Sequence, residues 1–417
     1  MGSVERADVV IVGAGAAGLM AAIWAGRSFP EKKVVLLDGA AKIGAKILVA
    51  GGGRCNVTHY QVDPKRYAGS STAAIAKVLK RFDVPETVAF FRELGVELKR
   101  EETGKLFPTT DSAKDVLRAL LGAVAQAGVD LRHPRRVERV AAVAGGFEVE
   151  GVWGRIRCAQ LVLATGGLSL PKSGSDGKGL EFAKDLGHSV SRTFPALVPL
   201  TVASDDALRD LGGITVSATI RLHASSGKRI TEFTNSTLCT HFGLSGPSVL
   251  DMSRHLLKAM ERDPGAYLTL NWVPGMDDPA MDAALQGLGH GSVRRFLQSR
   301  DLPDRLVTML LERSGLDVET RGDRMTRAER RNLVRNLTEM RLEITGTRGY
   351  KFAEVTAGGV PLREIDLKTM ASRVQPGLFL CGEICDVDGP IGGLNFQWAW
   401  SSGYVAGCSL GRVMERV

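Results

Sequence analysis

The chain has 417 residues, of which 44% are hydrophobic and 24% charged, and its formal net charge is +8. This composition is ordinary for a soluble globular protein, and the length allows two or three domains. The positive charge permits weak contact with anions such as nucleic acid or lipid surfaces but does not demonstrate it. The uncharged stretch 9–26 contains four glycines, which argues against a membrane span.

We expect no targeting segment at the N-terminus. Glu5, Arg6 and Asp8 leave no basic region ahead of the apolar stretch, so we predict no signal peptide and expect a cytoplasmic protein. The six cysteines should then be reduced thiols. Cys381 and Cys385 are separated by three residues, the wrong spacing for a C-x-x-C pair, and we predict no metal site.

The first motif is a glycine-rich turn between an apolar strand and a helix. Val9 to Val12 is a short β-branched run typical of a strand buried on both faces, and strong helix formers fill Leu19 to Ala25. Between them, Gly13 turns the chain, Gly15 lets the backbone approach a pyrophosphate, and Gly18 lets the helix and strand pack closely. The N-terminus of the helix would offer free N–H groups to the phosphates.

The next strand supplies the acidic residue that this motif requires. Val34 to Leu37 is a second apolar run, and Asp38 follows it, 20 residues beyond Gly18. A carboxylate at that distance accepts hydrogen bonds from a ribose. Strand, turn, helix and acid together predict an adenine dinucleotide site.

The chain then alternates helical and extended patterns up to about residue 192. Gly51 to Gly53 precede Arg54, Cys55 and Asn56 in a loop suited to lie against a ligand. A strand at Gln160 to Ala164 should return beside the first one and bring Thr165 and Gly166 near the dinucleotide. The remaining elements expected here are helices at 73–91, 113–127 and 174–186 and a β-meander at 135–156.

A β-rich and then helical insertion is expected from about residue 193. Alternating runs predict strands at 197–202, 215–223 and 267–272, and 277–341 reads as helical. No lysine occurs from Ala259 to Tyr350, and Arg321 to Arg341 is rich in arginine. A solvated helix face, with ion pairs to Asp323, Glu329 and Glu339, is favoured over an RNA-binding patch.

The C-terminal segment repeats the strand, acid and helix order. Gly377 to Gly382 predicts a strand, Glu383 follows it, and a helix is expected from Trp398 to Arg412. The two ends of the chain should therefore build one site. The expected domains are a discontinuous dinucleotide domain (1–192 and 343–417), an inserted β-rich lobe (193–276) and an inserted helical lobe (277–342).

The motifs resemble a bacterial flavoprotein family, the NAD(P)/FAD-dependent oxidoreductases of the HI0933-like, bile-acid-reductase-like group. The resemblance covers nearly the whole chain and implies an α/β fold: a Rossmann-like, glutathione-reductase-type FAD domain with an insertion. Cys381 and Cys385 depart from the family pattern. The motifs that carry the resemblance are 13–18, 51–58, 163–167, 240–247, 355–360 and 382–407.

The resemblance implies a role for each matching residue. Asp38 would hold the adenosine ribose with Lys46 beside it, and Gly382 and Glu383 would hold the ribityl chain. A helix N-terminus beside the flavin would stabilise negative charge on the reduced ring. The pyrophosphate would lie on Gly13, Gly15, Ala16, Ala17 and Gly18, the flavin beside Gly52, Arg54, Cys55 and Asn56, and its pyrimidine end at Asn395, Phe396 and Gln397.

We therefore predict an FAD-dependent oxidoreductase that transfers a hydride to or from a small organic substrate. No second dinucleotide motif occurs, so NAD(P)H would dock only transiently, and oxygen is an alternative acceptor. An RNA-modifying flavoprotein and a non-enzymatic flavin-binding protein are the alternatives.

Two residues are candidates for a catalytic role. His241 is the candidate for proton transfer, against a structural histidine at the lobe interface. Cys55 is a candidate redox thiol, against the favoured reading as a packing residue. Tyr350 and Lys351, where the insertion rejoins the dinucleotide domain, are further candidates against a surface role.

Overall fold

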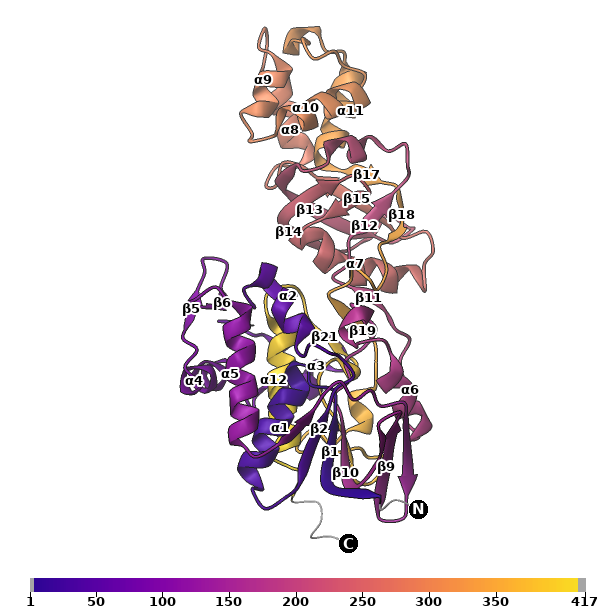
Figure 1. Cartoon of the computed structure of the whole chain (residues 1–417). Coiled ribbons are helices and arrows are strands. Elements are labelled where there is room, and N and C mark those ends of the chain that lie inside the picture. Colours follow the sequence, from indigo (N-terminus) through magenta and orange to yellow (C-terminus); the bar gives the residue numbers. More distant parts are fainter. Residues whose placement is uncertain (1–3, 412–417) are drawn as a thin grey trace. The chain divides into compact units, whose positions relative to one another are not determined.

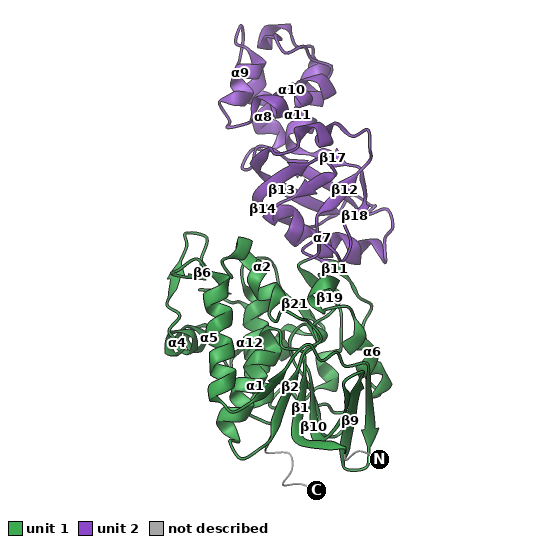
Figure 2. Ribbon diagram, viewed as in Figure 1, with its two compact units in different colours: residues 1–195, 354–417 green, residues 196–353 purple. Residues whose placement is uncertain are grey.

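The computed structural model describes residues 4–411, and the chain forms two compact units. One unit combines Met1–Pro195 with Glu354–Val417, and the other is the continuous segment Ala196–Ala353 (Figure 2). The inserted unit extends past residue 343, where the sequence pattern placed its end. The reason is that β18 (Ile344–Thr347) pairs with β12 (Leu200–Val202) in the sheet of that unit.

The discontinuous unit is built on a seven-stranded sheet with the strand order β7-β2-β1-β10-β9-β8, in which β20 also pairs with β10. Parallel pairing aligns Val9 with Val34 on one side and with Gln160 on the other, so β1 is central. The predicted strands at the start of the chain and at 160–164 are confirmed as neighbours. The sheet strands are β1 (Glu5–Val12), β2 (Val34–Leu37), β7 (Asp130–Arg132), β8 (Arg139–Val143), β9 (Gly146–Gly151), β10 (Gly154–Leu163) and β20 (Leu378–Leu380).

Two helices from opposite ends of the chain, α1 (Ala16–Ser28) and α12 (Leu394–Gly407), pack closely against each other (Figure 1). Glycines on α12 make this possible. A Cβ at Gly403 would lie 2.5 Å from the carbonyl oxygen of Ala17, and one at Gly407 would lie 2.5 Å from that of Ala21. Without side chains there, the two backbones can approach. The start of α1 is thereby fixed beside the C-terminal segment.

Two predicted helices differ from the structure, and one helix was not predicted. The helix expected at 73–91 is two helices, because Asp83 and Glu86 form a capping box that begins a new helix there. The helix that begins at Ala45 was not predicted. The C-terminal helix begins at Leu394 rather than Trp398 and ends at Gly407, and Arg412 lies outside the described residues. The other helices of this unit are α2 (Ala45–Gly53), α3 (Thr72–Leu79), α4 (Val84–Glu93), α5 (Ala113–Gln126) and α6 (Lys178–Asp185).

Short strands complete this unit. They form small two- or three-stranded sheets outside the main one, and β11 leads into the inserted unit while β19 leads out of it. These strands are β3 (Thr58–His59), β4 (Ala68–Gly69), β5 (Leu98–Arg100), β6 (Lys105–Pro108), β11 (Phe194–Ala196), β19 (Val355–Ala357) and β21 (Val387–Asp388).

The inserted unit contains a seven-stranded antiparallel sheet in the order β17-β16-β13-β14-β15-β12-β18, with its own hydrophobic core. Its longest strand, β14 (Arg229–Thr240), was not predicted, because the first half of the strand is mostly exposed and carries little apolar alternation. The further elements are β13 (Thr215–His223), β15 (Gly243–Ser245), β16 (Tyr267–Asn271), β17 (Met340–Leu342), α7 (Pro247–Met260), α8 (Asp278–Gln286), α9 (Val293–Gln298), α10 (Asp304–Arg313) and α11 (Arg327–Thr338).

Within residues 4–411, no helix has the length and apolar character needed to cross a membrane. The apolar stretch at 9–26 is strand, turn and helix, as predicted.

Candidate FAD site

Glycine is needed at the three positions of the first motif for different structural reasons. A Cβ at Gly13 would lie 2.5 Å from the carbonyl oxygen of Ala164, and one at Gly18 would lie 1.8 Å from that of Gly13. Packing within the protein therefore requires glycine at both positions. Gly15 is exposed, and a Cβ there would meet no protein atom within 4 Å. Its open space, directly before the N-terminus of α1, fits the approach of a pyrophosphate.

Asp38 fixes the shape of this loop. Its Oδ2 accepts a hydrogen bond from the backbone N–H of Ala14 at 2.6 Å, and its Oδ1 accepts one from Ala40 at 2.7 Å. The sequence motif did not reveal this loop-positioning role. An ionised carboxylate has about four acceptor positions, so both oxygens can still accept from a ribose hydroxyl. The ribose contact stays a prediction.

We expect Asp38→Ala to weaken FAD binding without unfolding the protein. The change removes an acceptor for the ribose and leaves the N–H of Ala14 without its partner, and such a loss costs about 1–3 kcal/mol. Titration of the apoprotein with FAD measures the dissociation constant. Asp63→Ala removes an exposed carboxylate that caps a short turn elsewhere in this unit and serves as the control. An unchanged constant in Asp38→Ala would show that another residue reads the ribose.

The N-terminal and C-terminal segments of the chain meet beside the glycine-rich turn at residues 13–18. A Cβ at Gly382 would lie 2.6 Å from the Cβ of Ala17 at the start of α1. The carbonyl of Gly382 accepts the indole N–H of Trp398 at 3.0 Å, and its N–H donates to Ser402 Oγ at 2.9 Å. Gly382 is therefore held between α1 and α12, beside the glycine-rich turn at residues 13–18.

An ion pair joins two residues that the resemblance assigned to different parts of the cofactor. Lys46 Nζ lies 2.6 Å from Glu383 Oε2 and also donates to Ser175 Oγ at 3.1 Å. The other oxygen, Oε1, accepts from Ser169 Oγ at 2.8 Å and from the backbone N–H of Thr356 at 3.0 Å. The charge of the Glu383 carboxylate is thus balanced by Lys46, and its hydrogen bonds hold it in a fixed orientation.

Thr356 belongs to this network, and the sequence motifs did not single it out. Its hydroxyl oxygen accepts from the N–H groups of Leu168 at 2.7 Å and Ser169 at 3.0 Å. A Cβ at Gly167 would lie 2.4 Å from that hydroxyl. The only sequence signal was the resemblance over 355–360, which carried no role for a single residue. Thr356 ties the loop after β10 to the segment before β20.

The second glycine loop brings its residues to one place. Gly51 and Gly52 are left-handed, with φ of 58° and 70°. Arg54 Nη1 lies 2.6 Å from Glu101, and its guanidinium lies over the ring of Phe107 at 4.0 Å. Arg54 is therefore held by an acid and an aromatic ring of the protein, and its contact with a flavin stays a prediction.

Cys55 is fully buried, and burial raises the pKa of its thiol to about 12. The thiol is protonated at neutral pH, whereas redox exchange requires the thiolate. This supports the packing interpretation. The redox role of Cys55 stays an untested prediction.

Buried polar atoms without partners provide a test of whether a ligand fits. Among the described residues, five buried side-chain polar atoms have no hydrogen-bond partner, and two of them belong to predicted site residues: Asn56 Oδ1 and Thr165 Oγ1. An unpaired buried group costs about 1–3 kcal/mol, so such atoms call for a partner outside the protein. Together with the open space at Gly15, they fit a bound dinucleotide.

The start of α12 offers backbone groups rather than side chains. Asn395 binds Gly389 through both amide atoms, at 2.8 and 2.9 Å. Gln397 is buried, accepts from Thr58 Oγ1 at 2.6 Å and donates to the carbonyl of Phe82 at 2.9 Å. Phe396 stacks on a neighbouring tryptophan. Since protein groups already engage both amide side chains, the free N–H groups of the first helical turn are the donors that remain for a ligand.

His241 lies in the inserted unit, exposed in the turn between β14 and β15. Its backbone carbonyl accepts from Arg209 Nε at 2.7 Å, and its ring meets Phe242 edge-on. The imidazole is free of an ion pair within the described part of the chain. Its catalytic role stays a prediction, as do those of Tyr350 and Lys351.

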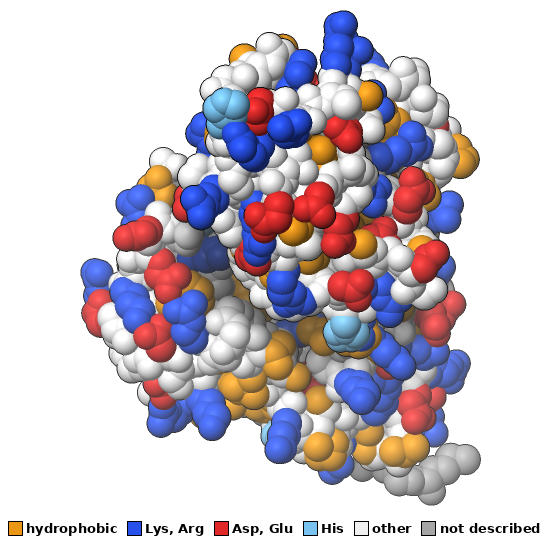
Figure 3. Space-filling view, turned by 90° about the horizontal axis from the view of Figure 1, so that it is seen from above, with side chains coloured by type: hydrophobic (Ala, Val, Ile, Leu, Met, Phe, Trp, Pro, Cys, Tyr) orange, Lys and Arg blue, Asp and Glu red, His pale blue; other side chains and the backbone are white. Residues whose placement is uncertain are grey.

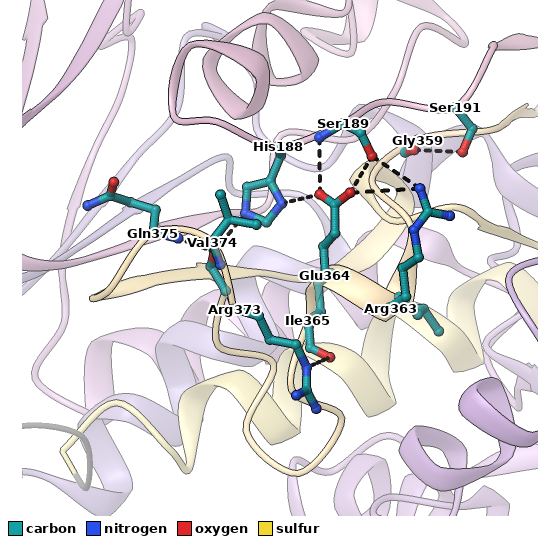
Figure 4. Close-up of polar contacts among 12 residues, drawn as sticks. His188, Ser189, Ser191, Gly359, Arg363, Glu364, Ile365, Arg373, Val374 and Gln375 are labelled. Carbon is teal, nitrogen blue, oxygen red and sulfur yellow. Dashed lines mark hydrogen bonds and ion pairs between the residues drawn. The ribbon is translucent and has the colours of Figure 1, made fainter.

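A second polar cluster has the composition of a catalytic triad but is a structural tie (Figure 4). His188 lies 2.9 Å from Glu364 through Nδ1 and 2.8 Å from Ser372 Oγ through Nε2. The same Oγ accepts the N–H groups of Val374 and Gln375, so it caps a turn and is not free to attack a substrate. Burial raises the pKa of Glu364, but hydrogen bonds from Ser189 and His188 outweigh it and hold this pKa below its usual range.

The glycine-rich turn, the helix N-termini and the buried polar atoms without partners define a dinucleotide-binding protein with a Rossmann-like fold. Residues 7–409 match the model of the HI0933-like protein Rossmann domain, and the chain belongs to this family. The fold class and family predicted from the sequence are confirmed.

Two relatives and one solved structure are similar to the chain. It is 34% identical over 403 residues to the ribosomal RNA dihydrouridine synthase of Escherichia coli K12, covering 96% of this chain and 97% of that protein. It is also 34% identical over 402 residues to the 3-dehydro-bile acid delta(4,6)-reductase of Clostridium scindens, covering 95% and 97%. A quinol-fumarate reductase structure with menaquinol shares the fold, with a TM-score of 0.50 at 16% identity over 100% of this chain and 72% of that one.

Proposed function

We propose that this protein reduces a carbon–carbon double bond conjugated to a carbonyl group, with NAD(P)H as the transient electron donor. The observation that carries the proposal is the site built around Gly15, which fits FAD. The names of the two relatives describe substrates of one chemical kind. The double bond that is saturated in dihydrouridine is conjugated to a carbonyl of the uracil ring, and a 3-dehydro-delta(4,6) steroid is a conjugated dienone.

The reaction would add two electrons and two protons to the substrate. NAD(P)H provides a hydride, the carbon β to the carbonyl receives a hydride, and the carbon α to it receives a proton. Bound FAD would supply the hydride transfer between donor and substrate. Lys46 and Glu383 would orient the cofactor, and the N–H groups at the start of α12 would hold negative charge beside it. His241 would donate the proton to the α-carbon.

Anaerobic stopped-flow absorbance tests this proposal. The flavin is first reduced with NADH or NADPH and then mixed with cyclohexenone, with a steroid 4-en-3-one or with an oligouridine RNA. We expect at least one of these acceptors to reoxidise the flavin and to become saturated at the double bond. Cyclohexanone, which lacks the double bond, is the matched control. Reoxidation by oxygen alone, with none of the three conjugated acceptors reduced, would contradict the proposal.

A uridine in RNA is the second candidate substrate, alongside a small enone. The observation that favours it is a row of three exposed arginines on α11 of the inserted unit: Arg327, Arg331 and Arg335.

A further inference from the structure

An exposed row of arginines lies on one helix of the inserted unit. From Ala259 to Tyr350 the chain contains fourteen arginines and no lysine. Three of them, Arg327, Arg331 and Arg335, are exposed on α11, which Figure 1 shows beside α8 and α10. Residues four apart lie on the same helix face, about 6 Å from one another along the axis. We call these three residues the arginine row.

The arginine row forms no ion pairs within residues 4–411, unlike other arginines of the same unit. Arg294 binds Asp304 at 2.7 Å, and Arg330, on the same helix as the row, binds Asp282 at 2.8 Å. Within residues 4–411, the three guanidinium groups of the row form no ion pair. The charges of this row are therefore available to a partner outside the chain.

The acid expected to pair with this helix has another role. The carboxylate of Glu329 accepts from the backbone N–H of Thr326 at 2.8 Å and from its hydroxyl at 2.9 Å. It thereby forms the capping box that begins α11. Of the other two acids expected, Asp323 pairs with Arg321 and His290 outside the row, and Glu339 forms no ion pair within residues 4–411. The predicted solvated face with ion pairs does not extend to the arginine row.

Helix stability does not explain the row. Like charges four residues apart repel and destabilise a helix. Arg327 is also at the first helical position, where the helix dipole disfavours a positive charge. Arg335 lies in the last turn, where the dipole favours a cation, but this accounts for only one of the three arginines.

We propose that the arginine row binds the phosphate backbone of an RNA, which presents the conjugated uracil ring to the flavoprotein. Arginine forms two parallel hydrogen bonds to a phosphate group, and lysine does not. Three evenly spaced guanidinium groups match a repeated anion rather than a single one. The choice of RNA rests on the reductase activity proposed above, since uridine carries the required double bond.

The surrounding charge argues for local recognition rather than for adsorption to a membrane. On the face shown in Figure 3, basic and acidic side chains are interspersed rather than separated into a broad positive field. An anionic lipid surface attracts clustered basic residues through such a field. A short row of three arginines suits a narrow partner such as a nucleic acid strand.

The test compares two triple variants of the full-length protein. Arg327→Ala, Arg331→Ala and Arg335→Ala together remove the row. Ala is the best helix former and repulsion is relieved, so this variant should keep its melting temperature and its bound FAD. The control variant lowers the net charge equally, at three exposed arginines of the other unit that pair with acids: Arg118→Ala, Arg139→Ala and Arg155→Ala.

Fluorescence anisotropy with a labelled oligouridine RNA measures binding at several salt concentrations. We expect the row variant to bind at least tenfold more weakly. The slope of log K against log salt should fall in magnitude by about 2, because each lost phosphate contact on a single strand contributes about 0.7. The control variant should retain most of the affinity, and a row of three glutamines should behave like the row of three alanines.

Three outcomes would overturn the inference. One is RNA binding by the row variant within twofold of wild type and with an unchanged slope. Another is equal loss in the control variant, which would show dependence on net charge alone. Loss of binding to phosphatidylserine vesicles with unchanged RNA binding would reassign the row to lipid and also overturn it. Reduction of the three conjugated acceptors is measured in parallel: failure with all three contradicts the proposed reductase activity, whereas RNA binding reports on the row.

Discussion

Gly15→Val should yield a folded, colourless protein. The backbone at Gly15 has φ of −78° and ψ of −171°, which any residue adopts, and a Cβ there meets no protein atom within 4 Å. The added side chain would fill the space that a pyrophosphate must enter, so FAD should bind at least 100-fold more weakly, a loss of about 3 kcal/mol. The flavin absorbance per mole of purified protein measures this directly.

A neighbouring glycine is the control that separates binding from folding. A Cβ at Gly18 would lie 1.8 Å from the carbonyl oxygen of Gly13, so Gly18→Val should lose stability as well as flavin. Gly15→Val should instead keep the melting temperature of the apoprotein. Full flavin content in Gly15→Val would mean that the dinucleotide does not pass over this loop, and the assignment of the site would fail.

The sequence predicted the parts of the site that depend on local backbone geometry. Gly13 and Gly18 are required where a strand turns into a helix, and their spacing shows this without knowledge of the rest of the fold. Asp38 was identified for the same reason, since it directly follows the next parallel strand. The structure adds that its carboxylate binds the N–H of Ala14, a contact that the motif spacing does not specify.

Contacts between distant segments were beyond sequence reasoning. Lys46 and Glu383 are 337 positions apart, and only the folded sheet brings them to 2.6 Å. Thr356 is an ordinary polar residue in its local sequence, yet its hydroxyl fixes the loop after β10. For Gln397 the resemblance suggested a flavin contact; the structure shows its amide buried among protein partners, and the flavin contact stays a prediction.

Two secondary-structure errors have local causes. The helix break at Asp83 was signalled by an acid, a proline and a glutamate in capping-box order, but the amphipathic pattern on both sides obscured it. Strand β14 begins with charged, exposed residues, so apolar periodicity is weak there. Its partner β13 is largely buried and was predicted correctly. Periodicity thus identified the long buried strand β13, and it missed β14 and the short strands β15 and β17.

His241→Gln should separate proton transfer from cofactor binding. The dinucleotide motif lies in the other unit, so FAD content and the flavin spectrum should match wild type. The backbone carbonyl of residue 241 would still accept from Arg209, so the turn should be retained. Removing a general acid typically slows the catalysed step on the order of 10²–10⁴-fold.

Single-turnover reoxidation of the reduced flavin measures this effect. Rates with the conjugated acceptor are compared with rates with oxygen, which needs no positioned acid of this kind and should be unaffected. His290→Gln is the matched control, because His290 is an exposed histidine of the same unit that pairs with Asp323. If His241→Gln keeps the acceptor rate within about threefold of wild type, the loss is too small for acid catalysis. The proton would then come from another group, and His241 would be a surface residue of the turn.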